Sequence, residues 1–187
     1  EMVIYELHVG SLGFGKKGPG TFEDAIKFLD HLVDLGVNTV DPCMRALQQS
    51  DPDIFLLAGR YTLMETTPLD ALFPLCMERG ASVVLGGPYN SGFLAGGDRY
   101  DYLAAKPEHH ERRERLRQLA GRQGVDLAAA ALQFGAAHPV VSATIPGASS
   151  PQHLKRNAAL MALKIPATFW RELVQEGLLP PEAPLPE

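Results

Sequence analysis

The sequence predicts an α/β protein built around a parallel sheet, because short apolar runs alternate with amphipathic segments along most of its 187 residues. Two observations carry this prediction. Apolar runs of strand length recur along the chain, and the apolar residues between them recur at helical spacing. Glycine or proline marks most of the boundaries. The expected strands are residues 2–9, 37–42, 53–59, 81–87 and 140–147.

Five strand–helix units are too few for a closed (β/α)8 barrel, which needs eight units and at least roughly 200 residues. We therefore expect a single domain, residues 1–187, with the architecture of an incomplete barrel. A doubly wound, flavodoxin-like sheet is the alternative that the same alternation allows.

The expected helices begin and end at recognisable signals. Thr21 followed by Asp24 marks one helix start, and Gly36 ends that helix. The pair Ser150-Pro151 opens another helix. The expected helices are residues 21–36, 43–50, 67–80, 107–123, 125–138 and 150–163 and a last one from residue 166, with a long loop at 88–106 and a flexible, proline-rich tail at 180–187.

The composition argues against several classes of protein. A net charge of −5 provides no basic surface for nucleic acid, and no apolar run reaches the roughly 18–20 residues that span a membrane. Cys43 and Cys76 lie in apolar surroundings without metal-ligand spacing, so we interpret them as buried thiols in a reducing, cytoplasmic compartment. His109 and His110 fall on a charged helix face, and we predict no metal site.

The segment TIPGASSPQHLKRN, residues 144–157, has the pattern of a phosphate-binding turn. A strand ends in a glycine turn, and a helix then opens at Ser150-Pro151. Unpaired N–H groups and the positive end of the helix dipole attract phosphate at such a helix start. The same pattern is also an ordinary strand-to-helix connection, so both interpretations stay open at this point.

Residues 38–179 resemble the C-terminal half of an aldo-keto reductase, in particular the branch of aldose, fucose and pyridoxal dehydrogenases. The segments DPDIFLLAGRYTLME, ERGASVVLGGPYNSGFLAGG, LAAAALQFGAAHPVVSATIPGASSPQHLKRNAAL and IPATFWRELVQEGLL carry the resemblance, in the family's order and spacing. It implies the later strands of a barrel, which bind NADP(H) in that family.

Residues 2–37 resemble a different family, the α-amylase-type glycoside hydrolases, near their branching-enzyme and trehalohydrolase members. The strand YELHVG and the helix GTFEDAIKFLDHLVDLGV match the first strand–helix unit of that barrel. The two resemblances meet around Gly36, Val37 and Asn38. We therefore interpret the chain as an engineered or selected chimera of two barrel fragments, with a misassembled natural gene as the alternative.

The aldo-keto reductase resemblance implies a set of cofactor-contacting residues. Gly86 stands where many members place a tyrosine that stacks on the nicotinamide, and Ser149 stands where many NADP-preferring members have an arginine. The implied cofactor-binding residues are Asn38 at the nicotinamide carboxamide, Gly87, Pro88, Asn90 and Ser91 over the pyrophosphate, Gly147, Ala148 and Ser149 in the phosphate turn, and Gln152 and Asn157 at the adenosine end.

The same resemblance places the family's catalytic Asp, Tyr, Lys and His on the first four barrel strands. Tyr61, Tyr89, Lys106 and His138 do not match those positions, and Glu6 lacks the carboxylate partner that a glycoside hydrolase needs. We therefore expect no catalytic residues, no evolved enzymatic activity and no required cofactor, with weak NADP(H) or phosphate binding as a remnant. An NADP(H)-dependent aldo-keto oxidoreductase is the alternative.

An incomplete barrel also leaves two edge strands open. Apolar edge strands pair with other chains when nothing covers them. We therefore expect the chain to form a homo-oligomer, a dimer or a larger assembly, through its sheet edges.

Overall fold

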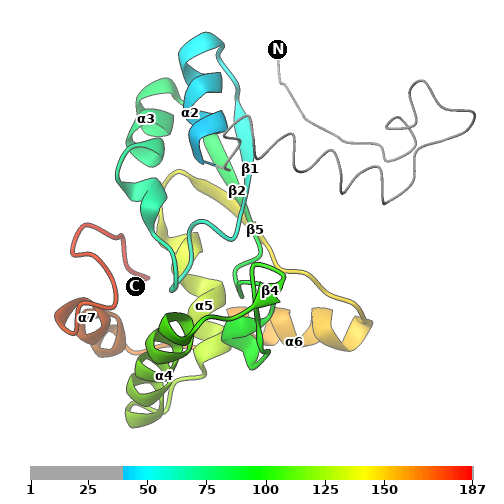
Figure 1. Cartoon of the computed structure of the whole chain (residues 1–187), viewed down its shortest axis with the longest axis vertical. Coiled ribbons are helices and arrows are strands. Elements are labelled where there is room, and N and C mark those ends of the chain that lie inside the picture. The colour runs from blue at the N-terminus through cyan, green and yellow to red at the C-terminus, as the bar shows by residue number, and fades with distance from the viewer. Residues whose placement is uncertain (1–39, 187) are drawn as a thin grey trace, which may run out of the picture. The chain divides into compact units, whose positions relative to one another are not determined.

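The computed structural model describes residues 40–186 (Figure 1). Contacts between Cα atoms divide the chain into two units, Glu1–Pro52 and Asp53–Glu187. Within the described part of the first unit, helix α2 (Val40–Gln49) replaces the end of the strand expected at 37–42. That expectation is wrong from Val40 onward, because Pro42 is tolerated in the first turn of a helix. The strand and helix expected at residues 2–9 and 21–36 lie outside the described residues.

The second unit contains a parallel sheet of three strands: β1 (Ile54–Ala58), β2 (Ser82–Gly86) and β5 (Val141–Ile145), in the order β1-β2-β5. All three strands were expected from their apolar runs. Their spatial order follows their order in the chain, as in a (β/α)8 barrel, whereas a doubly wound sheet reverses its order at a switch point. The predicted α/β fold with a partial barrel is therefore confirmed.

Helical connections join the three strands. Between β1 and β2 lie η2 (Thr67–Leu69) and α3 (Leu72–Arg79). Between β2 and β5 lie η3 (Phe93–Ala95), α4 (Pro107–Arg122), α5 (Leu127–Phe134) and η4 (Gly135–Ala137), and after β5 follow α6 (Pro151–Met161) and α7 (Ala167–Gln175). None of the helices in the described part is long and apolar enough to cross a membrane.

A short hairpin interrupts the segment that was expected to be a loop. Strands β3 (Arg99–Tyr100) and β4 (Leu103–Ala104) pair in antiparallel register around Asp101 and Tyr102. Both turn residues have positive φ, 48° and 66°, as a two-residue type I′ turn requires. The sequence lacks the Asn-Gly or Asp-Gly pair that usually announces this turn, which is why the hairpin was missed.

One face of the parallel sheet forms the core of the second unit. Leu57, Val83 and Leu85 are at most 2% exposed on this face. An aromatic group packs nearby: the ring of Tyr61 lies 4.8 Å from that of Phe73 and 4.9 Å from that of Phe134. Close packing is visible at Gly135, where a Cβ atom would lie 2.4 Å from Leu85 Cδ1.

The opposite face of the sheet has exposed apolar side chains in the described part of the chain. Leu56 of β1 and Ile145 of β5 are 62% and 50% exposed, and the register places both on the same side of the sheet as Val84. Parallel sheets normally have both faces covered. The exposed apolar side is the one that faces inward in a closed barrel.

The chain after α7 returns to the body of the second unit. Leu178 and Leu179 are buried, and within the segment 180–187 the Ala183 N–H donates to the Pro180 carbonyl. Ala183 itself is 5% exposed. The flexibility of the tail stays a prediction.

Acidification from pH 6.5 toward 4 will destabilise the fold through His138. The imidazole is 6% exposed and packs on Tyr61 and Phe73, and burial lowers its pKa to about 4. The imidazole binds a proton near pH 6.5 in the unfolded chain but only near pH 4 in the folded chain. The stability that the neutral His138 contributes is therefore complete above pH 6.5 and is lost as the pH falls toward 4. We expect a loss of roughly 2 kcal/mol in urea unfolding followed by circular dichroism.

The matched control is His138→Asn, whose side-chain oxygen can accept the Val140 N–H that now donates to His138 Nδ1 at 3.2 Å. Its stability should depend less on pH over this interval. Equal pH dependence in both proteins would show that His138 does not titrate as stated.

Candidate functional site

The candidate site lies where β1, β2 and β5 end, because parallel strands present their carboxyl ends at one edge of the sheet. The Gly59 N–H donates to the Gly86 carbonyl at 2.9 Å, so the pairing of β1 and β2 continues to this edge. Gly87 has φ 61°, and a Cβ atom there would lie 3.5 Å from the Gly59 nitrogen. Glycine therefore allows the chain to turn closely across the end of β1.

After β2 the chain passes through three consecutive residues with left-handed backbone: Asn90, Ser91 and Gly92, with φ of 47°, 60° and 88°. Asn90 is 1% exposed, and its Nδ2 donates to the Gly59 carbonyl at 3.3 Å. Its Oδ1 is buried and has no hydrogen-bond partner among the described residues. Buried acceptors are nearly always paired, so this oxygen marks a place for a donor.

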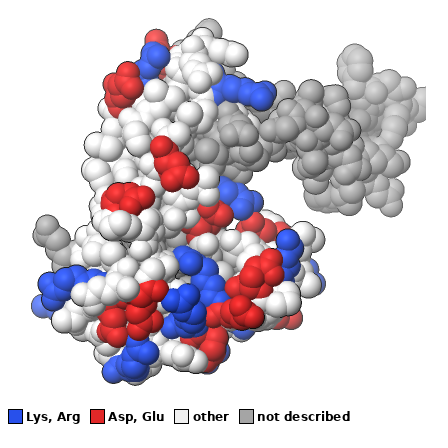
Figure 2. Space-filling model, turned by 60° about the vertical axis from the view of Figure 1, so that its left-hand side comes forward, with Lys and Arg blue, Asp and Glu red and all other residues white. Residues whose placement is uncertain are grey.

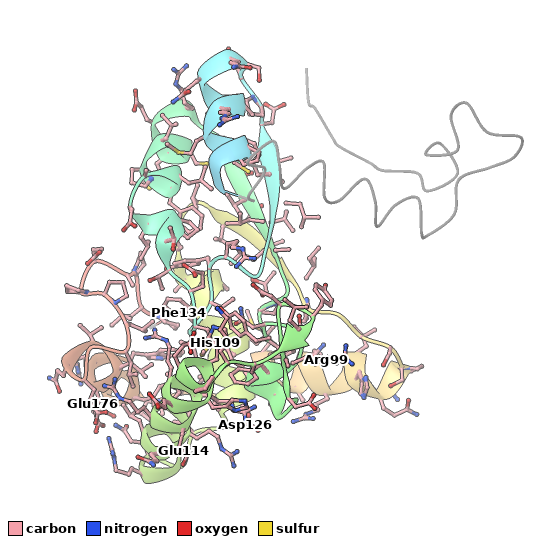
Figure 3. The ribbon with its side chains drawn as sticks, viewed as in Figure 1. Arg99, His109, Glu114, Asp126, Phe134 and Glu176 are labelled. Carbon is pink, nitrogen blue, oxygen red and sulfur yellow. The ribbon has the colours of Figure 1, made fainter. Side chains whose placement is uncertain are left out.

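The β3–β4 hairpin is tied to the same edge. Asp101 forms an ion pair with Arg60 at 2.8 Å, and the Tyr102 N–H donates to Ser91 Oγ at 2.9 Å. Figure 3 shows Arg99 of the hairpin and His109 of α4 in this part of the molecule. His109 stacks on Tyr100 at 3.9 Å between ring centroids, and burial raises the pKa of Tyr100 to about 12.

The turn between β5 and α6 forms the second side of the site. Ser150 caps α6, and its Oγ accepts the His153 N–H at 3.2 Å. Ser149 Oγ lies 3.0 Å from His153 Nδ1. Asn157 is 8% exposed, and its Nδ2 donates to the Gly147 carbonyl at 3.5 Å.

A hydrogen bond between Tyr89 and Asn157 connects the two sides. The Tyr89 hydroxyl donates to Asn157 Oδ1 at 2.9 Å, across 68 residues of sequence. Burial raises the pKa of Tyr89 above its usual value; the charge of Arg156 opposes this shift and that of Asp126 adds to it. Tyr89 therefore stays protonated at neutral pH and keeps this bond.

A cavity of about 220 Å³ opens beside this bond. It lies between the loop after β2 and helix α6, with α5 contributing one wall. Its lining residues are Tyr89, Gly92, Ala95, Ala128, Gly147, His153, Arg156, Asn157 and Leu160. Because the sequence predicts that Asn157 contacts the adenosine end of a cofactor, we call it the nucleoside cavity below.

The structure brings most of the residues named from the sequence to one edge of the sheet. Gly147 and Asn157 line the nucleoside cavity. Residues 87–91 lie in the same loop as Gly92, which lines this cavity. Ala148, Ser149 and Gln152 are exposed at the start of α6. Asn38 lies outside the described residues.

Besides Asn157, three lining residues have polar side chains, and sequence reasoning named none of them as a site residue: Tyr89, His153 and Arg156. A signal for two of them was present, because His153, Arg156, Asn157 and Leu160 share one face of α6 at helical spacing. Tyr89 carried no such signal, since its partner Asn157 is far away in the sequence.

Two curated relatives are similar to this chain. It is 38% identical over 149 residues to a pyridoxal 4-dehydrogenase of Microbacterium luteolum, covering 78% of this chain and 44% of that protein. It is 34% identical over 153 residues to a D-threo-aldose 1-dehydrogenase of a Pseudomonas species, covering 79% of this chain and 46% of that protein. The chain therefore spans less than half the length of these relatives.

These relatives correct the expectations on activity and on cofactor, and they leave a third interpretation without support. Both are named as dehydrogenases, which contradicts the expectation that the chain has no evolved enzymatic activity and is not an enzyme. Dehydrogenation by hydride transfer depends on a cofactor such as NAD(P)H, so the expectation that none is required is also wrong. The interpretation as a chimera with an amylase-like segment at residues 2–37 gains no support from them, and that segment lies outside the described residues.

The fold agrees with these similarities. An aldo-keto reductase of Bacillus halodurans, in its holo form, superposes with a TM-score of 0.59 at 23% sequence identity, covering 90% of this chain and 59% of that one. The model of the aldo/keto reductase family matches residues 42–176, which is most of the chain. This chain therefore belongs to the aldo/keto reductase family.

Proposed function

We propose that the described residues form the nucleotide-binding side of an NADP(H)-dependent aldo-keto oxidoreductase that interconverts a carbonyl compound and its alcohol. The observation that carries the proposal is the nucleoside cavity, closed by the Tyr89–Asn157 hydrogen bond at the carboxyl ends of β2 and β5. Relatives named as dehydrogenases of pyridoxal and of an aldose support this activity. A cytoplasmic location, as the sequence predicts, is part of the proposal.

The residues present fit such a cofactor. Asn90 Oδ1 is a buried acceptor without a partner in the described part of the chain, so it would accept from a hydroxyl or amide N–H of the cofactor and not from a pyrophosphate oxygen, which offers no donor. Gly147 leaves open space where a side chain would stand. The cavity is smaller than the roughly 300–1,000 Å³ of sites for drug-sized ligands, so it suits one part of a dinucleotide. When bound, the nicotinamide group supplies or accepts the hydride.

The chain's own residues bind and orient in this proposal. Gly87, Pro88, Asn90 and Ser91 would lie against the pyrophosphate, because their backbone turns closely there. Gly147, Ala148 and Ser149 would offer backbone N–H groups at the start of α6. Gln152 and Asn157 would contact the adenosine end, and Asn38 the nicotinamide carboxamide.

A fluorescence titration of the 187-residue chain with NADPH tests the proposal. We expect saturable binding below millimolar concentration, with the nucleotide emission enhanced on transfer to the protein. No change in emission up to millimolar NADPH would contradict it. Turnover of short aldehydes and aldoses with NADPH then tests the carbonyl class.

We also propose that the chain self-associates through the open face and edges of its sheet, because Leu56 and Ile145 expose apolar surface there. Leu56→Glu should shift the sedimentation coefficient toward that of a monomer. Leu154→Glu is the matched control, since Leu154 is equally exposed, at 62%, but lies on α6. A wild-type chain that sediments as a monomer at all concentrations would contradict the proposal.

A further inference from the structure

A second cavity, of about 180 Å³, adjoins the nucleoside cavity. The two share Ala95, Ala128 and Arg156 in their walls. The second cavity lies between η3, helix α4 and the start of α5. Its lining residues are Phe93, Leu94, Ala95, Gly96, Arg113, Arg117, Asp126, Leu127, Ala128 and Arg156. We call it the arginine cavity.

The charge of its lining is strongly positive. Three arginines, Arg113, Arg117 and Arg156, and one acidic residue, Asp126, line it. Asp126 is already engaged as the N-cap of α5, where its Oδ1 accepts the N–H groups of Ala128 and Ala129 at 2.8 and 3.2 Å. Figure 2 shows basic and acidic side chains interspersed over the lower part of the molecule.

Arg113 is held in place by the wall of the cavity. Its Nη1 donates to the carbonyls of Phe93 and Gly97 at 3.3 and 2.6 Å, and its guanidinium carbon lies 4.0 Å from the centroid of the Phe93 ring. Its Nη2 lies 3.3 Å from His110 Nδ1, so both terminal nitrogens of Arg113 already have partners in the protein. Arg113 contributes a fixed positive charge, and it also orders the loop that contains Gly96.

Arg117 and Arg156 are different: both are exposed, and neither has a hydrogen bond or an ion pair with another described residue. Their donors are available to a ligand. Like charges that converge on one recess repel each other, and a bound anion relieves that repulsion. After Asp126 is counted, two positive charges remain uncompensated, which matches the charge of a phosphoryl dianion.

We propose that the arginine cavity binds a phosphoryl group through Arg117 and Arg156. The group belongs either to a nucleotide seated in the adjoining nucleoside cavity or to free phosphate; the first source rests on the function proposed above. Guanidinium groups suit this ligand because their planar donors match phosphate oxygens in pairs. If the phosphoryl group belongs to a nucleotide, the cavity would supply positive charge that Ser149, which stands in place of an arginine, does not supply.

The test compares the wild-type chain with Arg117→Gln, Arg156→Gln and a control, Lys155→Gln. Lys155 also lies on α6 and is exposed, but it lines neither cavity. Arg117 is the sharper probe, since it lines the arginine cavity and not the nucleoside cavity. Binding of NADPH, NADH and inorganic phosphate is measured by calorimetry on each protein at low and high salt.

We expect both arginine variants to weaken binding of a phosphoryl-bearing ligand roughly tenfold, with Lys155→Gln unchanged. If Arg117→Gln weakens the binding of NADPH and leaves that of NADH unchanged, the phosphoryl group belongs to the cofactor. If it weakens the binding of inorganic phosphate alone, the cavity binds free phosphate. No loss in either variant, or an equal loss in Lys155→Gln, overturns the proposal. Phosphate binding without binding of either nucleotide leaves the arginine cavity supported and contradicts the proposed function instead.

Discussion

Replacing Arg112 by Met will lower the free energy of unfolding by about 3 kcal/mol, the largest stability effect that we expect from a single side chain outside the apolar core. Arg112 lies on α4, and its Nε and Nη2 donate to the Leu63 carbonyl at 3.3 and 3.0 Å. Nη2 also donates to the Leu178 carbonyl at 2.5 Å. The side chain thus joins α4 to the chain after β1 and to the chain after α7.

The loss is large because Met retains the aliphatic packing but leaves two partly buried carbonyls without a donor. Burial lowers the pKa of Arg112 from its usual value, but the guanidinium stays charged at neutral pH. Urea unfolding monitored by circular dichroism measures the change. Arg112→Lys should recover part of the stability, since one ammonium can reach one carbonyl.

The control is Arg122→Met on the same helix. Arg122 forms ion pairs with Glu172 of α7 and with Glu176, the residue that follows this helix, but the Arg122 side chain is 51% exposed, and solvent-exposed pairs contribute little. We expect its unfolding midpoint to stay close to that of the wild type. Equal destabilisation by Arg122→Met and Arg112→Met would contradict the special role of the carbonyl contacts.

Replacing Gly147 by Val will weaken NADPH binding by at least roughly tenfold without changing stability, the largest functional effect that we expect. Gly147 lines the nucleoside cavity, and a Cβ atom there meets nothing within 4 Å. The valine therefore fits the protein and fills space that the nucleotide would need. Fluorescence titration with NADPH and urea unfolding of the same samples separate the two effects.

Gly121→Val is the matched control for this variant. Gly121 also has open space around its Cβ position, but it lies near the end of α4 and lines neither cavity. Its NADPH affinity should equal that of the wild type. A Gly147→Val chain that binds NADPH as the wild type does would place the ligand elsewhere.

Local patterns in the sequence were sufficient for the strands and most helix boundaries of the second unit. The apolar runs of β1 and β2 match the observed strands, because a strand in a parallel sheet favours a continuous apolar segment. Strand β5 was also expected, although it contains Ser142 and Thr144. Ser150 also proved to be the cap of α6, as its chemistry indicates. These features depend on residues that are close to one another in the sequence, so the sequence alone predicts them.

Local patterns failed where backbone geometry was unusual. The β3–β4 hairpin turns on Asp101 and Tyr102 in left-handed conformations, which their identities do not announce. The expected strand at 37–42 gave way to α2, although Val40 favours strands. In each case the surrounding structure overrides a weak local preference.

The sequence by itself determined the class of the fold, the parallel strands of the second unit and the glycine turn before α6. Only the tertiary structure decided what those elements form together. Tyr89 meets Asn157 across 68 residues, and Arg112 meets the carbonyls of Leu63 and Leu178, because long-range packing sets these distances. The arginine cavity likewise depends on the tertiary structure, because its lining residues come from η3, α4, α5 and α6. No local spacing in the sequence predicts that these elements meet.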